Sequence, residues 1–351
     1  MQRGSADVLT NYGVILDALK RHEDALESFD QALAMRADDT AALYNRGNAL
    51  KHLGRYAKAL ASYERALALA PGHLDALYNR ANTLCALERH RDALADYDAV
   101  LALRPRHVPA LNRRGNALAA LGHPAEALAA YDTALAVEPA NAEVHSNRSV
   151  TLVALGRLDE ALRSCDAALA SRPDYADALY NRGNALRALA RHEDARASYA
   201  AALAIEPRRA DALNNLGLTL VWLGRHAEAL SNFDAALAVD PNDIGALHNR
   251  ANALAELGAF EEALAPCDKV LAKNPLHADA LNTRGVVLAK LGRHREALAS
   301  YDAALAAAPE RVDIQVNRGT ALLDLDRFDE ALAGFDNALK NDPENVVALI
   351  N

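Results

Sequence analysis

The sequence predicts an all-α fold in which pairs of short helices stack on one another as a solenoid. Three observations predict it: a fixed repeat length, apolar residues at helical spacing, and a regular pair of turn signals. A small residue recurs every 34 residues with no insertion. These residues are Gly13, Gly47, Ala81, Gly115, Ser149, Gly183, Gly217, Ala251, Gly285 and Gly319. Repeats of this length bury their apolar faces by stacking on neighbours, so one elongated domain is expected.

Each repeat contains two helical patterns separated by a break. In residues 40–73, Leu43 and Leu50 lie at helical spacing in the first half. Gly54 ends that pattern, and Pro71 ends the second one because proline cannot donate a helical hydrogen bond. The apolar residues of the second helix are Ala59, Leu60, Tyr63, Ala66 and Leu67. A helix-turn-helix unit is therefore expected in every repeat.

Ten such repeats fill residues 6–345, and positions are numbered below from the start of each repeat. The repeats begin at Ala6, Thr40, Leu74, Val108, Ala142, Ala176, Ala210, Ile244, Ala278 and Val312. Residues 346–351 match the opening of a further repeat, so we expect a truncated eleventh unit there. Because a solenoid normally ends in a polar cap, the chain is expected to be a piece of a longer protein.

Four positions give the repeat its character: a small residue at position eight, alanine at twenty, an aromatic residue at twenty-four in most repeats and proline at thirty-two. We expect positions eight and twenty to face each other so that the two helices approach closely. This pattern resembles the tetratricopeptide repeat family over nearly the whole chain. The resemblance implies a right-handed superhelix that binds other proteins. Two departures are leucine at position four and arginine at position seven, where the family has an aromatic residue and leucine.

Composition and charge exclude several classes of partner. The net charge is −9, and acidic and basic residues alternate, so no basic stripe for nucleic acid is present. No stretch of about 18 apolar residues exists and the start lacks the apolar region of a signal peptide. We therefore expect no membrane partner and a cytoplasmic location. The excess of arginine over lysine and the abundance of alanine favour a bacterial source.

An internal alignment of the repeats predicts a row of ion pairs. Position seven is arginine in eight repeats, and position twenty-five is acidic in nine. The exceptions coincide when each position twenty-five is matched with position seven of the next repeat, since neutral Ala200 precedes apolar Leu216. The hypothesis is therefore a partly buried row of salt bridges across the repeat boundaries. The alternative is that both rows point to solvent.

Asparagines form a second row, on the face that the first helix of each repeat turns to the inside of the superhelix. Position six is asparagine in Asn11, Asn45, Asn79, Asn147, Asn181, Asn215, Asn249 and Asn317, and position nine in Asn48, Asn82, Asn116, Asn184 and Asn252. A side-chain amide has a donor and an acceptor, so it can pair with a peptide unit of any sequence. The alternative is that these amides bond locally between adjacent helices. The two roles are compatible.

The asparagine row resembles the ladder in the superhelical domain of O-GlcNAc transferases, which implies that it holds polypeptides by their backbone. It is less similar to the carboxylate clamp of chaperone-binding members, which needs lysine at position five. Because amides alone give weak binding, aromatic anchors are expected. The candidates are Tyr44, Tyr78 and Tyr180 at position five, and Trp222, with Leu218 and Val221, in the seventh repeat. For Trp222 the alternative is packing against a neighbouring helix.

Catalytic motifs are absent from the sequence, which has no glycine-rich phosphate loop and no HExxH. Histidine recurs at position seventeen in His22, His90, His192, His226 and His294, where other repeats have Tyr56, Leu158, Phe260 or Phe328. This exchange indicates a packing position. Because these histidines lie one repeat apart, we expect no shared metal ion and no cofactor.

The sequence thus favours a non-enzymatic scaffold that binds extended protein or peptide along a concave groove. The first alternative is the substrate-recognition portion of an O-GlcNAc-transferase-like glycosyltransferase whose catalytic domain lies outside this chain. The second is a structural repeat array that self-associates end to end through uncapped termini.

Overall fold

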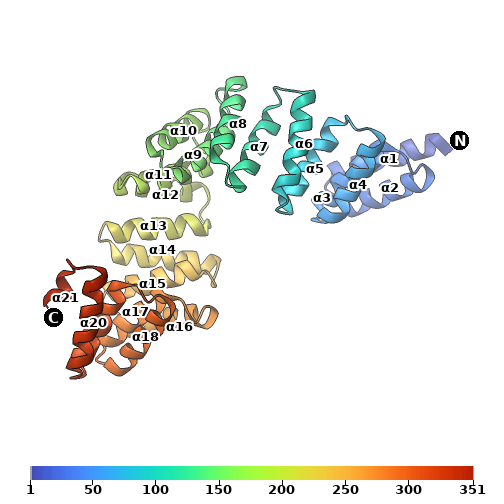
Figure 1. The fold of residues 1–351 in the computed structure, drawn as a ribbon. Coiled ribbons are helices and arrows are strands. Elements are labelled where there is room, and N and C mark those ends of the chain that lie inside the picture. The colour runs from blue at the N-terminus through green and yellow to red at the C-terminus, as the bar shows by residue number, and fades with distance from the viewer. Residues whose placement is uncertain (1, 351) are drawn as a thin grey trace. The chain divides into compact units, whose positions relative to one another are not determined.

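The computed structural model describes residues 2–350, and all its regular elements in that range are helices (Figure 1). The first helices of the repeats are α1 (Gln2–Ala18), α3 (Thr40–His52), α5 (Leu74–Ala86), α7 (Val108–Ala120), α9 (Ala142–Ala154), α11 (Ala176–Ala188), α13 (Ala210–Trp222), α15 (Ile244–Glu256), α17 (Ala278–Lys290) and α19 (Val312–Leu323). The second helices are α2 (His22–Met35), α4 (Tyr56–Leu69), α6 (His90–Leu103), α8 (Pro124–Val137), α10 (Leu158–Ser171), α12 (His192–Ile205), α14 (His226–Val239), α16 (Phe260–Lys273), α18 (His294–Ala307) and α20 (Phe328–Asn341). A short helix, α21 (Val346–Ile350), follows them.

The all-α repeat fold predicted from the sequence is confirmed. Within the described range the odd-numbered helices from α1 to α9 and from α13 to α19 each pack on the even-numbered helix that follows, as in α1 with α2 and α17 with α18. From α3 onward each odd-numbered helix begins at the first residue of a predicted repeat, whereas α1 begins at Gln2, before Ala6. The chain divides into two compact units, Met1–Asn181 and Arg182–Asn351, with the boundary inside α11.

The turn inside each hairpin depends on position fifteen, which has a left-handed backbone conformation. Six repeats place glycine there, as at Gly54 with φ 69°. Four repeats place another residue in the same conformation, as at Ala190 with φ 56°. Because a side chain with a Cβ is strained in this region, glycine is the residue that fits the turn best.

In the seven repeats with glycine at position eight, that glycine lies close against the ring at position twenty-four. A Cβ added to Gly47 would lie 2.5 Å from Cε1 of Tyr63, and one added to Gly115 would lie 2.4 Å from Cε1 of Tyr131. The sequence pattern predicts that the alanine at position twenty lies opposite this glycine, but the aromatic ring is the nearest side chain. The small residue is needed because the buried ring occupies the space of its side chain.

The predicted ion-pair row across the repeat boundaries is confirmed. Nε of Arg46 lies 2.6 Å from Oδ1 of Asp30 in the preceding repeat, and the arginine side chain is 26% exposed. The same contact joins Arg114 to Asp98, Arg148 to Asp132, Arg250 to Asp234, Arg284 to Asp268 and Arg318 to Asp302. Arg80 departs from the row, because it forms a bidentate pair with Asp96 of its own repeat. The alternative of two separate solvent-facing rows is therefore excluded for these pairs.

The helices of the described residues were compared with the requirements for a membrane span. None of the helices between residues 2 and 350 combines the length and the apolar character needed to cross a bilayer.

Candidate functional site

The candidate site residues lie on the odd-numbered helices, and side-chain caps fix the starts of α3, α5, α7, α9, α15 and α17. Oδ1 of Asp39 accepts a hydrogen bond from the backbone N–H of Ala42 at the start of α3. Nδ1 of His73 accepts one from the N–H of Ala76 at the start of α5. These caps satisfy donors that have no partner inside the helix. Consecutive odd-numbered helices also contact each other, as α3 does with α5 and α5 with α7.

An amide ladder joins α3 to α5. Nδ2 of Asn79 donates to the hydroxyl of Tyr44 and to Oδ1 of Asn48, both at 3.0 Å. Its Oδ1 accepts a hydrogen bond from Nζ of Lys51 at 3.3 Å. All four side chains are half-buried. The Asn79 amide is therefore committed to holding two neighbouring repeats together.

The same ladder recurs along both units. At position six, Asn147 donates to Asn112, Asn181 to Ser146, Asn215 to Asn184, Asn249 to Asn214 and Asn317 to Asn282, at 2.9 to 3.1 Å. Asn252 accepts a hydrogen bond from Thr283 and also pairs with His248. The local bonding that the sequence left open as an alternative is thus how the structure uses these amides. Asn45 differs, because its side chain makes no hydrogen bond to any described residue.

A third contact, which sequence reasoning missed, joins position nine to the buried tyrosine at position twenty-four. The tyrosine hydroxyl donates to the asparagine oxygen in four repeats: Tyr63 to Asn48, Tyr97 to Asn82, Tyr131 to Asn116 and Tyr199 to Asn184. Burial raises the pKa of Tyr131 to about 12 and raises the pKa of Tyr63 further. The sequence does carry a signal for this contact. The repeats with phenylalanine at position twenty-four, which has no hydroxyl, lack asparagine at position nine. These repeats contain Phe29 with Val14, Phe233 with Leu218, and Phe335 with Thr320.

The ladder is interrupted between α5 and α7. Position six of the fourth repeat is Arg113, whose Nη2 instead lies 3.4 Å from Oε1 of Glu143. Among the described residues, neither the hydroxyl of Tyr78 nor Nδ2 of Asn82 has a hydrogen-bond partner. Tyr78 and Asn82 therefore lack the hydrogen bonds across the boundary that Tyr44 and Asn48 form with Asn79.

A hollow of about 470 Å³ lies at this interruption. It is lined by Tyr78, Asn82, Cys85, Ala86, His90, Tyr97, Arg113, Asn116 and Ala117. Burial raises the pKa of the Cys85 thiol, and its contact with Tyr97 and the charge of Arg113 oppose part of that rise. The hollow thus combines amide donors, one guanidinium and an apolar wall.

Repeat models from known proteins match almost the whole chain. Models described as tetratricopeptide repeat match residues 6–39, 40–73, 78–142, 112–176, 148–212, 210–243, 248–312 and 288–350. The chain belongs to the tetratricopeptide repeat (TPR) family. No match to the sequence of this TPR protein is found among curated proteins.

Solved structures share the TPR fold at low sequence identity. The APC/C hetero-tetramer Cut9-Hcn1 aligns with TM-score 0.57 and 14% identity over 99% of this chain and 83% of that chain. A TPR protein from Parabacteroides merdae aligns with TM-score 0.54 and 22% identity over 69% of this chain and 96% of that chain. PilW, a type IV pilus biogenesis factor, aligns with TM-score 0.55 and 23% identity over 60% and 97%. These likenesses concern the fold alone.

Three of the four aromatic candidates of this TPR protein lie against histidine rings. The rings of Tyr44 and Tyr78 lie 4.9 and 5.4 Å from those of His73 and His107. Trp222 is 71% exposed and stacks on His192, with ring centroids 5.5 Å apart and planes 3° from parallel. An exposed anchor and a ring packed on a neighbouring helix were alternatives for Trp222. The structure combines them, because the ring is exposed and also stacks on His192. Tyr180 lies half-buried in α11.

Proposed function

We propose that this TPR protein is a non-enzymatic scaffold that binds extended polypeptide on its odd-numbered helices, with the hollow between α5 and α7 as a principal contact. The observation that carries the proposal is the interruption of the amide ladder at Arg113. At most other boundaries the asparagine at position six instead donates to a side chain of the preceding repeat. Here a cavity and free amide groups coincide, as a peptide-binding surface requires.

The chemistry of the hollow suits the carbonyl groups of a peptide backbone. The oxygens of Asn82 and Asn116 accept hydrogen bonds from Tyr97 and Tyr131, at 2.7 Å in both cases. Their Nδ2 groups make no hydrogen bond to a described residue, so the amides offer donors. At Asn48 both lone-pair positions of the oxygen are taken, by Tyr63 and Asn79. Pairing with both polar groups of a peptide unit is therefore unfavourable at that residue.

The magnitude of these contacts requires apolar anchoring as well. At about 1 kcal/mol net for each hydrogen bond, three or four amide contacts correspond to roughly millimolar affinity before ordering costs. The ring of Tyr78, held against His107, supplies an apolar anchor at the hollow. Trp222 supplies a separate anchor in the second unit, because its ring is exposed and held parallel to His192.

Binding to an array of short synthetic peptides of varied sequence tests this proposal. The double variant Asn82→Ala with Asn116→Ala should lose most of the array signal, because it removes both amide donors of the hollow. The matched control is Asn147→Ala, which removes a ladder amide outside the hollow lining and should keep the signal. Helical content measured by circular dichroism checks that each variant is folded. Equal signals from the native chain and the double variant would refute the proposal.

A further inference from the structure

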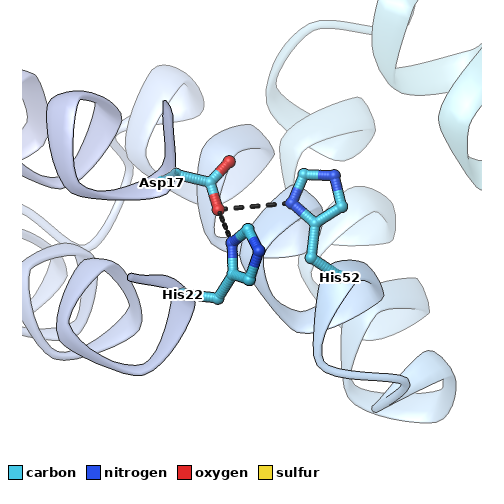
Figure 2. A group of neighbouring side chains, drawn as sticks. All are labelled: Asp17, His22 and His52. Atoms are coloured by element: carbon cyan, nitrogen blue, oxygen red, sulfur yellow. Dashed lines mark hydrogen bonds and ion pairs between the residues drawn. The ribbon is translucent and has the colours of Figure 1, made fainter. Parts of the chain in front are cut away.

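The first repeat boundary contains a cluster of metal-ligating side chains. Nδ1 of His22 lies 2.6 Å from Oδ1 of Asp17, and Nδ1 of His52 lies 3.3 Å from the same oxygen. Figure 2 shows the three side chains converging from different helices: Asp17 from α1, His22 from the start of α2 and His52 from α3. The two imidazole rings are 4.7 Å apart between centroids.

The same positions are arranged differently in the other repeats that carry histidine at position seventeen. Nδ1 is buried without a hydrogen-bond partner in His90, His192, His226 and His294. The His294 nitrogen does lie 3.2 Å from Oδ2 of Asp324, outside hydrogen-bond geometry. Position twelve of that repeat is Ala289, so no second carboxylate is present where the first repeat has Asp17. Packing alone therefore accounts for a histidine at this position but not for the trio at the first boundary.

We propose that Asp17, His22 and His52 bind a divalent transition-metal ion of the zinc type. Their three ligand atoms lie within 4.8 Å of one another. A tetrahedral zinc ion with bonds of about 2.0 to 2.2 Å holds its ligand atoms about 3.3 Å apart. The His52 contact already has this spacing, the His22 contact must widen from 2.6 Å to about 3.3 Å, and the two histidine nitrogens lie within 4.8 Å of each other. Small side-chain rotations therefore convert the hydrogen-bonded cluster into a coordination sphere.

The surroundings fit a site with two imidazoles and one carboxylate. The side chains of Asp17 and His22 are 19% and 22% exposed, which shields the ligands from competing water. His52 is 43% exposed and provides the entry side, where water can complete the coordination. The Asp17 carboxylate offsets part of the charge of the ion.

The consequence of binding is mechanical rather than catalytic. The ligands belong to α1, α2 and α3, so an ion held by all three would tie the first repeat to the second. Backbone amides of α1 and α3 should exchange hydrogen more slowly when the site is loaded, because opening of this boundary then requires loss of a ligand.

Titration of the full chain with Co²⁺, after removal of any histidine tag, tests the site. Saturable visible absorption of tetrahedral Co²⁺ at one equivalent, displaced by Zn²⁺, is the expected result. His52→Ala should weaken binding by at least about tenfold, since loss of supporting groups alone costs that much at metal sites. Because His52 is 43% exposed, this variant should remain folded. His226→Ala, at the same position of another repeat, is the matched control and should leave Co²⁺ binding unchanged.

A grafted site gives an independent test of the same geometry. Ala289→Asp combined with Asp324→His places the three ligand types around His294, at the positions that they occupy in the first repeat. This double variant should bind a second equivalent of Co²⁺. Absence of the visible absorption in the native chain, or binding unaffected by His52→Ala, would overturn the proposed site. A graft without a second equivalent would contradict the claim that these three positions are sufficient.

Discussion

The boundary between α3 and α5 and the one between α5 and α7 begin from the same motif and end in different states. Both place tyrosine at position five and asparagine at position nine, as Tyr44 with Asn48 and Tyr78 with Asn82. The first pair is closed by two hydrogen bonds from Asn79. At the second boundary Arg113 stands in place of that asparagine, and a hollow opens. The residue at position six thus distinguishes these two boundaries: Asn79 bonds to both side chains of its pair, whereas Arg113 bonds to neither side chain of the other.

Removing the closing residue should have the largest effect on stability. Asn79→Ala should lower the free energy of unfolding by about 2 kcal/mol, because two half-buried acceptors lose their donor. Asn82→Ala is the matched control and should cost about half as much, because it loses only the bond from Tyr97. Urea unfolding and hydrogen exchange of α3 and α5 measure both. A larger loss from Asn82→Ala than from Asn79→Ala would contradict the distinction between the two boundaries.

Closing the open boundary should have the opposite sign. Arg113→Asn places an amide where it can donate to Tyr78 and Asn82, as Asn79 does one repeat earlier, and should stabilise the chain by about 1 kcal/mol. The lost contact with Glu143 is a pair with both side chains about half exposed, and such pairs contribute little. Slower hydrogen exchange in α5 and α7 is the expected readout. Faster exchange there would show that the ladder does not close.

The stabilisation from a tyrosine hydroxyl should depend on whether position nine of the same repeat offers a side-chain acceptor. Tyr97→Phe should cost about 0.5 to 1 kcal/mol, because it leaves the oxygen of Asn82 without its donor. Tyr301→Phe should be close to neutral, because Val286 stands at position nine of that repeat and offers no side-chain acceptor. Urea unfolding midpoints of the two variants give the comparison. Equal losses would indicate that ring packing, and not the hydroxyl contact, is being measured.

The buried tyrosine hydroxyls should also make the stability of the fold depend on pH. This is the smallest expected effect at neutral pH, and it grows at high pH. The pKa of Tyr131 is raised by burial from an ordinary value of about 10 to about 12. A group with a raised pKa keeps its proton in the folded chain while the unfolded chain loses it, so stability falls as the pH rises from about 10 toward about 12. Unfolding midpoints measured over this range should fall less steeply for Tyr131→Phe. An unchanged slope would argue against a buried, hydrogen-bonded phenol.

The features that depend on one repeat at a time could be predicted from the sequence. Helical spacing, Gly54 and Pro71 suffice for the hairpin, because these are local properties of the chain. The arginine row was also predictable, because Ala200 and Leu216 fail together and so identify which repeats are paired. Internal repetition thus replaced some of the information that structure normally provides.

The features that depend on distances between helices could not be predicted. The sequence places Asn79 on the first helix of its repeat. It does not show that the acceptors of Asn79 are Tyr44 and Asn48, which lie 35 and 31 residues earlier in the chain. The trio at the first boundary was missed for a related reason. The 34-residue spacing of the histidines at position seventeen does not show that His22 lies beside His52, which stands at position thirteen of the next repeat.

The proposed function depends most on peptide binding at the open boundary between α5 and α7. Its direct test is the affinity, measured by fluorescence anisotropy, of a peptide selected by the native chain on the array, for the native chain, Arg113→Asn and Arg113→Ala. Closure by Arg113→Asn should weaken binding at least about tenfold, equivalent to about 1.4 kcal/mol. Arg113→Ala, which removes the guanidinium but leaves the amides of Asn82 and Asn116 free, should weaken it much less. Unchanged affinity of Arg113→Asn, or equal losses in both variants, would contradict the claim that the interrupted ladder forms the binding site.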